Sequence, residues 1–466
     1  MSSLESTIDR VVRQVLAEMG EGRGKDSKNT RPGIFENIDD AVEACDAAQH
    51  RLIGLTLHER ASIIESIRKA ASENAEELSR MALDETKMGN WEHKVLKNRL
   101  AATNTPGVED LKSEVMSGDD GLTLIEFSPF GVIGAITPTT NPTETVICNA
   151  IGMIAAGNGV VFSPHPTAKN VSIRTVEILN EAVMRAGGPR NIITTVLEPT
   201  IEQANILMKH PKVRMLVATG GPGVVKAVLS SGKKAIGAGA GNPPALIDET
   251  ADIEQAARDV ILGCSFDNNL PCIAEKEIIA VEQIADRLIA CMKESGACFV
   301  TSQETLARME NLLLLDGKTV NKEYVGKSAS KIMSDLGIPC GEDVKVVSMV
   351  TDSGHPFVQH ELMMPVLPVV RVRNVEEGMK IAVEVEHGFR HTAMMHSMDV
   401  RRLSEFAKAI QTTIFVKNGP SYAGIGFGGE GFATFTIAGP TGEGLTSAKT
   451  FARKRRCVLT NAFNIK

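Results

Sequence analysis

The sequence predicts an α/β protein built on parallel sheets. Between residues 132 and 219, short apolar runs alternate with longer helical patterns, which is typical of βαβ units and of a parallel, nucleotide-binding type of sheet. The chain has 466 residues, and domains of about 100–200 residues are usual, so we expect two to three domains. Hydrophobic residues make up 43% of the chain and charged residues 23%, the proportions of a soluble globular protein.

Composition also excludes several classes of partner. The formal net charge of −7 gives no electrostatic reason to expect nucleic acid or an anionic membrane. Eight cysteines show no C-x-x-C pair and no zinc-ligand spacing. No signal peptide opens the sequence and no apolar run is long enough to span a bilayer. We therefore expect a reducing, intracellular compartment and no metal.

Residues 1–19 are predicted to form an amphipathic helix. Its apolar residues recur at helical spacing: Leu4, Ile8, Val11, Val12, Val15, Leu16 and Met19. Residues 20–36 follow as a flexible, glycine-rich polar linker. A helix on such a tether suits docking onto another protein. A terminal helix packed on its own domain is the alternative. Acidic residues on the polar face argue against a mitochondrial presequence.

The remaining elements follow in order. The pattern is helical from 39 to 111, and 122–127 and 132–136 are predicted to be strands of a hairpin. Further strands are predicted at 159–162, 191–196 and 213–219, with helices at 143–156, 167–186 and 201–209 between them. A second α/β segment is predicted over 242–432. The tail, 433–466, carries strand-like pieces at 434–437 and 457–459.

A glycine turn follows the strand predicted at 213–219. Thr219, Gly220, Gly221, Pro222 and Gly223 lead into a helical run at 224–230. Such a turn lets backbone N–H groups approach a pyrophosphate at a helix N-terminus. The full G-x-G-x-x-G fingerprint is absent, so a purely structural turn stays an alternative.

Cys272 is the candidate nucleophile. It ends the polar, loop-forming run 266–272, directly after a helical run at 253–264. The pKa of an ordinary cysteine thiol is about 8.5, so a nearby helix end or cation is needed to raise its thiolate fraction. The glycine-rich turn at 237–244 contains no acidic residue. A thiol without a nearby carboxylate base suits acyl-enzyme chemistry finished by another thiol. An inert cysteine is the alternative.

Four ordered motifs resemble those of the aldehyde dehydrogenase superfamily. They are the stretch 128–138, the glycine turn 237–244, the run 266–272, and Glu361-Leu362-Met363-Met364-Pro365-Val366. Their order and spacing agree from about residue 37 to 459. The resemblance implies an NAD-binding, Rossmann-type domain over 37–121 and 137–241, and an α/β catalytic domain over 242–432. It also implies a small β oligomerisation element from 122–136 and 433–466.

One departure from the superfamily is informative. Hydrolytic members carry a glutamate where this chain has Ala238, which lies 272 − 238 = 34 residues before Cys272. That glutamate activates the water that releases a free acid. Without it, a thioester on Cys272 should persist until coenzyme A, a thiol that needs less base assistance than water, accepts the acyl group. The sequence therefore resembles the acylating, coenzyme-A-dependent branch.

The resemblance also implies the site residues. Cys272 is the nucleophile, and either Thr140 or Asn141 donates a hydrogen bond to the oxyanion. Ser163 and His165 replace the superfamily's phosphate-side lysine, and Glu361 positions the nicotinamide end of the cofactor. The expected NAD-binding residues are Thr137, Pro138, Ser163, His165, Thr219, Gly220, Gly221, Gly223, Ala238, Gly239 and Glu361.

Within that branch, the runs 267–276 and 455–461 are most similar to the propionaldehyde dehydrogenases of propanediol-utilisation microcompartments, and the N-terminal helix resembles their encapsulation peptides. This resemblance implies oxidation of propionaldehyde to propionyl-CoA with NAD, in the lumen of a cytoplasmic bacterial microcompartment. It further implies a shell-protein contact through residues 1–19 and a homo-oligomer, dimer or tetramer. The alternative in the same branch is the acylating acetaldehyde dehydrogenase of ethanolamine utilisation. A hydrolytic aldehyde dehydrogenase and a catalytically silent scaffold are the alternatives from other classes.

Overall fold

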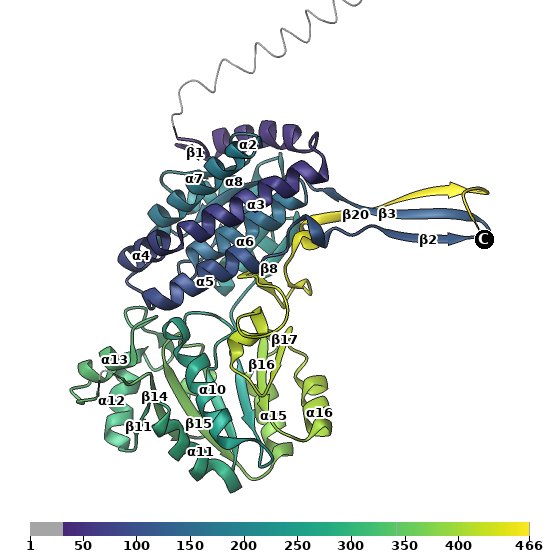
Figure 1. Cartoon of the computed structure of the whole chain (residues 1–466). Coiled ribbons are helices and arrows are strands. Elements are labelled where there is room, and N and C mark those ends of the chain that lie inside the picture. The colour runs from purple at the N-terminus through teal and green to yellow at the C-terminus, as the bar shows by residue number, and fades with distance from the viewer. Residues whose placement is uncertain (1–30, 342, 466) are drawn as a thin grey trace, which may run out of the picture.

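The computed structural model describes residues 31–341 and 343–465. It shows two α/β lobes and a three-stranded arm that extends sideways from them (Figure 1). The predicted N-terminal helix, residues 1–19, lies outside the described residues. No helix in the described ranges is long and apolar enough to cross a membrane.

The first lobe contains a six-stranded sheet in the order β1-β6-β5-β4-β7-β8, and every neighbouring pair is parallel. Its strands are β1 (Ile34–Phe35), β4 (Val132–Thr137), β5 (Gly159–Pro164), β6 (Ile193–Val196), β7 (Val213–Thr219) and β8 (Lys234–Ala238). The chain proceeds from β4 toward one edge through β5 and β6, and then toward the other through β7 and β8. This reversal creates a topological switch point between β4 and β7, where ligands of open α/β sheets bind.

Helices cover both faces of this sheet. The buried apolar residues of α2 (Ile38–Leu52), α8 (Ile201–Lys209) and α9 (Pro222–Leu229) pack on one face. The other face carries α3 (Leu57–Glu73), α4 (Ala75–Thr86), α5 (Trp91–Asn104), α6 (Pro142–Ala155) and α7 (Lys169–Arg185). Every residue of α6 is buried, including the polar side chains of Thr143, Glu144 and Asn149. This burial fixes the position of Asn141, the residue at its N-cap.

The second lobe contains a seven-stranded parallel sheet in the order β11-β14-β15-β10-β9-β16-β17. Its strands are β9 (Pro244–Ile247), β10 (Glu277–Val281), β11 (Ala297–Val300), β14 (Val346–Thr351), β15 (Val366–Val372), β16 (Thr392–His396) and β17 (Ile414–Lys417). Its helices are α10 (Ile253–Ser265), α11 (Glu282–Glu294), α12 (Gln303–Leu313), α13 (Ala329–Asp335), α14 (Pro356–Gln359), α15 (Val375–Val385) and α16 (Val400–Ile410). The predictions of a parallel-sheet α/β unit and of a second α/β unit after it are therefore confirmed.

Short elements connect these parts. They are the 3-10 helices η1 (Val108–Asp110), η2 (Pro166–Ala168), η3 (Phe266–Asn269), η4 (Ser421–Ile425) and η5 (Ala448–Phe451), and the two-stranded pairs β12 (Leu314–Leu315) with β13 (Thr319–Val320) and β18 (Ile437–Ala438) with β19 (Gly444–Leu445). After β17 the chain returns to the first lobe, where the Thr436 hydroxyl lies 2.8 Å from that of Thr219. The return places the C-terminal segment beside the switch point before it enters the arm.

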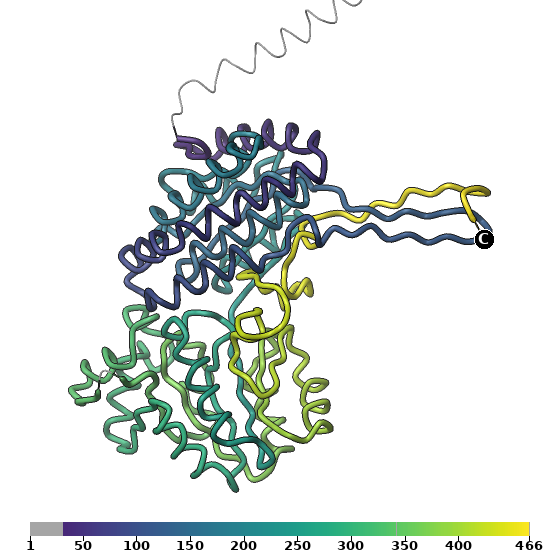
Figure 2. Tube along the Cα trace, in the orientation of Figure 1, coloured from purple at the N-terminus to yellow at the C-terminus, as the bar shows by residue number. Residues whose placement is uncertain are grey.

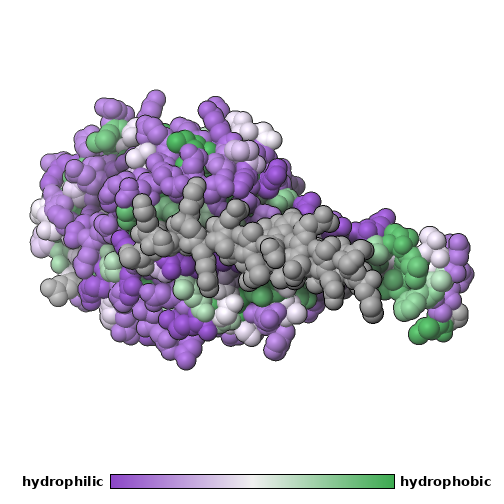
Figure 3. All heavy atoms as spheres, turned by 90° about the horizontal axis from the view of Figure 1, so that it is seen from above, coloured by the Kyte–Doolittle hydropathy of each residue, from purple (hydrophilic) through white to green (hydrophobic). Residues whose placement is uncertain are grey.

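The arm consists of β2 (Glu114–Gly118), β3 (Gly121–Pro129) and β20 (Ala452–Thr460), paired antiparallel with β3 in the centre. The Cα trace in Figure 2 follows β20 beside β3 along the length of the arm. Seen from above in Figure 3, hydrophobic residues gather near the outer end of the arm. Its exposed apolar side chains are Val115, Met116, Val458, Leu459, Phe463 and Ile465.

Two sequence predictions need correction here. The hairpin predicted from 122–127 and 132–136 does not form, because β3 pairs with β2 and β20 whereas β4 pairs with β5 and β7. The run Val132–Thr137 is apolar on both faces, as a central parallel strand requires, and so belongs to the first sheet. The linker predicted over 20–36 also ends too late, since Ile34 and Phe35 pair with β6.

Candidate active site

The predicted site residues Cys272 and Glu361 meet at one edge of the second lobe's sheet, together with Gly241 and His391. Gly241 precedes β9, Cys272 precedes β10, Glu361 precedes β15 and His391 precedes β16. Because these four strands are neighbours and parallel, their amino ends lie side by side. A thiol, a carboxylate and an imidazole from distant parts of the sequence are thereby brought together.

The loop before Cys272 has an unusual backbone. Asp267, Asn268 and Asn269 have φ values of 48°, 54° and 66°, all in the left-handed region. Asp and Asn adopt this conformation more readily than other residues with a side chain. The Asn269 amide closes the loop by donating to the backbone carbonyls of Cys264 and Glu275, each at 3.0 Å. This geometry explains why the sequence before the cysteine is Asp-Asn-Asn.

Gly241 allows three segments to meet. A Cβ atom at this position would lie 2.9 Å from His391 Cγ and 3.0 Å from the backbone oxygen of Cys272. Real Cβ contacts are longer, so only glycine permits the glycine-rich turn to approach both residues this closely. The turn therefore shapes the wall next to the thiol and contributes no carboxylate to it.

Burial controls the ionisation of Cys272. Burial and, to a smaller extent, the Glu361 carboxylate raise the pKa of the thiol to about 12, against the opposing effect of the Lys276 ammonium. Burial also raises the pKa of Glu361 to about 7, against the opposing effects of Lys276 and the Gly241 N–H group. The cation that the thiol needs is thus Lys276, a fully buried residue four positions after it.

Asn141 is held by a buried lysine. Its Oδ1 accepts a 2.6 Å hydrogen bond from Lys97 Nζ on α5. Within the described residues, its Nδ2 makes only a long 3.4 Å contact with the Thr140 hydroxyl. Asn141 is 7% exposed, whereas Thr140 is only partly buried. Asn141 therefore has an oriented amide N–H group free to donate.

The residues predicted to bind the cofactor lie together at the switch point of the first sheet. Thr137, Thr219 and Ala238 are the last residues of β4, β7 and β8, and Ser163 lies one residue before the end of β5. The other residues follow these strands directly: Pro138 after β4, His165 after β5, Gly220 to Gly223 after β7, and Gly239 after β8. A Cβ atom added to Gly221, Gly223 or Gly239 would meet no heavy atom within 4 Å, so the backbone is open to close approach there. These residues fit a dinucleotide.

Ala238 and His165 differ in exposure. Ala238 is buried, and its backbone oxygen accepts a 3.0 Å hydrogen bond from Gly220. His165 is exposed at the N-cap of η2, and its Nδ1 lies 2.8 Å from the Thr167 hydroxyl. Burial and the charge of Lys322 lower the His165 pKa. The lowered pKa favours the neutral imidazole, which can hydrogen-bond a hydroxyl.

Sequence reasoning missed several groups around the thiol. His391 is buried, burial and Lys276 lower its pKa to about 4, and its Nε2 has no hydrogen-bond partner among the described residues. Glu275 accepts hydrogen bonds from the Ser421 N–H at 2.8 Å and hydroxyl at 2.7 Å, and burial raises its pKa to about 7. Lys97 and Lys276 are the other two groups that sequence reasoning missed. Only the short separation of Lys276 and Glu275 from Cys272 could have indicated a role.

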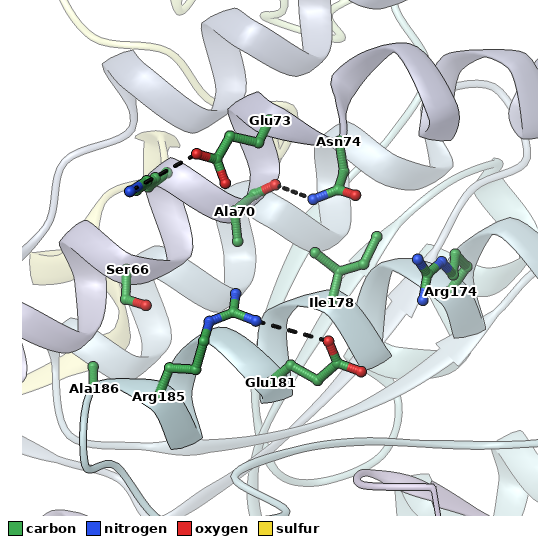
Figure 4. A pocket seen from close by; sticks show the side chains of 10 residues that line it. Ser66, Ala70, Glu73, Asn74, Arg174, Ile178, Glu181, Arg185 and Ala186 are labelled. Atoms are coloured by element: carbon green, nitrogen blue, oxygen red, sulfur yellow. Dashed lines mark hydrogen bonds and ion pairs between the residues drawn. The ribbon is translucent and has the colours of Figure 1, made fainter.

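A separate hollow lies on the helical layer of the first lobe (Figure 4). It has a volume of about 500 Å³ and lies between α3 and α7. The charged side chains on its wall are paired, as in Lys69 with Glu73 and Arg185 with Glu181. It contains no thiol or imidazole, and we assign it no part in the reaction.

In the first lobe an open glycine turn follows strand β7, and in the second lobe the thiol of Cys272 lies before strand β10. Together these features define a cysteine-dependent, dinucleotide-binding oxidoreductase. The model of the aldehyde dehydrogenase family matches residues 28–305. The chain belongs to the aldehyde dehydrogenase family.

Two individual relatives are similar to this chain over nearly their full length. The chain is 47% identical over 462 residues to the propanal dehydrogenase (CoA-propanoylating) of Citrobacter freundii, with 99% of each chain covered. It is also 47% identical over 467 residues to the acetaldehyde dehydrogenase (acetylating) of Salmonella typhimurium, again with 99% of each chain covered.

Two solved structures of propionaldehyde dehydrogenases are also similar to this chain. Rhodopseudomonas palustris propionaldehyde dehydrogenase with bound CoA and an acylated cysteine is 58% identical, with a TM-score of 0.92 over 93% of this chain and 99% of that chain. The propionaldehyde dehydrogenase from the Clostridium phytofermentans fucose utilisation microcompartment is 51% identical, with a TM-score of 0.92 over 93% of this chain and 100% of that chain.

Proposed function

We propose that this protein oxidises propionaldehyde to propionyl-CoA with NAD, through a thioester on Cys272. The observation that carries the proposal is Cys272 beside a glycine turn whose hydrolytic glutamate is replaced by Ala238. The acylated cysteine and bound CoA of the similar Rhodopseudomonas palustris enzyme support it. The replacement leaves the thioester without a carboxylate from this turn to activate water.

The reaction begins at the thiol. The Cys272 thiol loses its proton to solvent, a step that Lys276 favours, and the thiolate sulfur then forms a bond to the aldehyde carbon as the carbonyl π bond breaks. The resulting oxyanion accepts hydrogen bonds from the Cys272 backbone N–H and from Asn141 Nδ2, which we assign in preference to Thr140 because its amide is oriented. One such donor contributes about 3 kcal/mol to lowering the barrier.

Oxidation and acyl transfer follow. NAD, when bound, supplies the hydride acceptor. Glu361 would hold the nicotinamide end of NAD, and its Oε1 has no hydrogen-bond partner in the described residues. Loss of hydride from the thiohemiacetal leaves a thioester on Cys272. The neutral imidazole of His391 takes the proton from the thiol of coenzyme A, and Cys272 leaves as thiolate when propionyl-CoA forms.

The same chain acts as a homo-oligomer, dimer or tetramer, through its arm. Both outer strands, β2 and β20, expose nearly all their residues, and the arm carries exposed apolar side chains. Edges and apolar patches of this kind are covered in stable proteins. A second copy of the chain is the occupant we propose.

We also assign the enzyme to the lumen of a bacterial microcompartment, reached through residues 1–19 and a shell protein. The helical spacing of the apolar residues in this segment and the microcompartment origin of the Clostridium phytofermentans enzyme support this assignment. Residues 1–19 fused to a fluorescent protein should gather it into microcompartments in shell-producing cells. A diffuse signal would favour a helix that packs on its own domain.

Acetaldehyde is the second candidate substrate, because identity to the acetylating enzyme is also 47%. The deciding experiment compares NADH formation from propionaldehyde and from acetaldehyde, with and without coenzyme A, and identifies the product by mass spectrometry. The proposal expects coenzyme-A-dependent turnover, propionyl-CoA as product and the higher kcat/KM for propionaldehyde. Steady turnover to free propionate without coenzyme A would contradict it.

A further inference from the structure

A cluster of four charged side chains lies buried between the two lobes. Lys94 and Lys97 come from α5, Glu144 comes from the first turn of α6, and Asp267 comes from the loop before Cys272. All four are at most 2% exposed. Burying so many charges costs desolvation free energy that apolar side chains of the same volume would avoid. Such a cluster is weak evidence for stability, and its position in the site points to another role.

Lys97 is the centre of this cluster. Its Nζ lies 2.6 Å from Asn141 Oδ1, 2.6 Å from Asp267 Oδ2 and 3.0 Å from Glu144 Oε1. The ammonium group donates a hydrogen bond to Asn141 and forms ion pairs with the Asp267 and Glu144 carboxylates. Burial lowers the pKa of Lys97, but Asp267 and Glu144 outweigh burial and keep the ammonium charged.

The contact with Asn141 fixes the direction of its amide. Because the ammonium group has no acceptor, it can bind only the amide oxygen, so Oδ1 must face Lys97 and Nδ2 must face away. A positive charge on the amide oxygen also polarises the amide and strengthens its N–H groups as donors. Lys97 therefore prepares Asn141 Nδ2 to donate to an oxyanion.

The contact with Asp267 joins this amide to the nucleophile. Asp267 lies five residues before Cys272 in the loop with left-handed backbone, and it also accepts hydrogen bonds from Lys94 at 3.0 Å and from the Asn90 N–H at 2.7 Å. Burial works against its charge, but Lys94 and Lys97 hold its pKa below the ordinary value. One ammonium group thus bonds to both the cysteine loop and the oxyanion donor.

We infer that Lys97 is a positioning residue for the oxidation step: it orients and polarises Asn141 and fixes it relative to the Cys272 loop, so that the two act on one aldehyde. The inference rests on the proposed thiol chemistry but not on the identity of the acyl acceptor. Lys94 provides a matched comparison. It is equally buried and also pairs with Asp267, but it makes no hydrogen bond or ion pair with Asn141 in the described residues.

The experiment is a double-mutant cycle read by single-turnover NADH formation without coenzyme A. Lys97→Met is combined with Glu144→Gln so that no carboxylate loses its only cation, and this pair is made in the native and in the Asn141→Ala background. Lys94→Met is the control for loss of a buried charge. Asn141→Asp keeps the acceptor for Lys97 and removes the N–H donor. Thermal unfolding tests whether each variant is folded, and the rate of Cys272 alkylation tests whether its thiol keeps the native reactivity.

We expect Asn141→Asp to slow hydride transfer by about 10²- to 10³-fold, the usual effect of losing one oxyanion donor. The Lys97→Met/Glu144→Gln pair should slow it by about tenfold or more with Asn141 present and by less than about threefold with Asn141→Ala, because contacting residues show coupling energies. Lys94→Met should slow it less than the Lys97 pair does.

Equal effects of the Lys97 pair in both backgrounds, or equal effects of the Lys97 pair and Lys94→Met, would overturn the inference. The readout also separates this inference from the proposed function. Wild-type enzyme that forms NADH but releases free acid contradicts the coenzyme A proposal and leaves the cycle measurable. Wild-type enzyme that makes propionyl-CoA without coupling between Lys97 and Asn141 contradicts only the role of Lys97.

Discussion

Lys276 donates a hydrogen bond from Nζ to the side-chain oxygen of Asn269, at 2.5 Å, and a longer one to the backbone oxygen of the same residue, at 3.2 Å. Asn269 lies three residues before Cys272 and Lys276 lies four residues after it. The contact therefore closes the chain around the nucleophile and holds a buried positive charge near the thiol. Glu361 provides the opposing negative charge.

These two charges predict opposite effects on thiol reactivity. Lys276→Met removes a charge that lowers the Cys272 pKa, so alkylation by iodoacetamide should slow. Glu361→Gln removes a charge that raises the Cys272 pKa, so alkylation should become faster at the same pH. Labelling that is quenched at a series of times and analysed by mass spectrometry measures both alkylation rates. Changes in the same direction would contradict this electrostatic account.

Ala238 predicts the fate of the acyl group. Ala238→Glu restores the carboxylate of the hydrolytic relatives, so the share of product released as free propionate should rise. Ala238→Gln is the matched control, since it adds the same bulk at a buried position but no base. Product analysis with limiting coenzyme A measures the ratio. An equal rise in both variants would assign the effect to bulk.

Glu275 predicts how stability depends on pH. Its folded-state pKa is raised from 4.5 to about 7 by burial, so the folded protein binds this proton more tightly than the unfolded chain. The stabilisation is present below pH about 4.5 and is lost as the pH rises through about 7. Glu275→Gln should therefore reduce the fall in unfolding free energy between pH 5.5 and 8 by on the order of 2 kcal/mol.

Denaturant unfolding at several pH values measures this difference. Glu361 and Glu277 also have pKa values raised by burial and keep their own contributions in the variant, so the slope should diminish but not vanish. An unchanged slope would show that Glu275 stays ionised in the folded protein.

The register of the arm predicts how to break the oligomer. Met116 and Val458 both pair with Thr123, so the two exposed apolar side chains share one face of the arm. Met116→Glu with Val458→Glu should shift the protein to a smaller species in size-exclusion chromatography with light scattering, while the thermal midpoint of the isolated chain stays similar. Glu126→Ala, which changes an exposed residue of the central strand, is the control. An unchanged oligomer would show that this face is not the interface.

Local sequence patterns predicted most of the first sheet. The strand expected at 213–219 is β7 and the helix expected at 201–209 is α8, each at the same residues. These elements have their periodicity and their turn residues in a single short window. The hairpin error arose because the choice of partner for Val132–Thr137 depends on strands that follow it in the chain.

The site was predictable where a motif is contiguous and not where it depends on distant contacts. Cys272 and Glu361 lie within short motifs. Lys94 and Lys97 were missed, because their partner Asp267 is 173 residues away from Lys94 along the chain. The choice of Asn141 over Thr140 depends on the contact between Lys97 and Asn141. His391 was missed because it belongs to no motif and is brought to Cys272 only by the order of the parallel strands.

The measurement that tests the central claim most directly is the intact mass of the enzyme after mixing with propionaldehyde and NAD in the absence of coenzyme A. The account predicts one propionyl group on the protein, located on Cys272 by peptide mapping, absent in Cys272→Ala, stable for many turnover times and removed at once by coenzyme A as propionyl-CoA. An unmodified protein that continues to form NADH and propionate would contradict it, because the thioester would then be hydrolysed without the glutamate that Ala238 replaces.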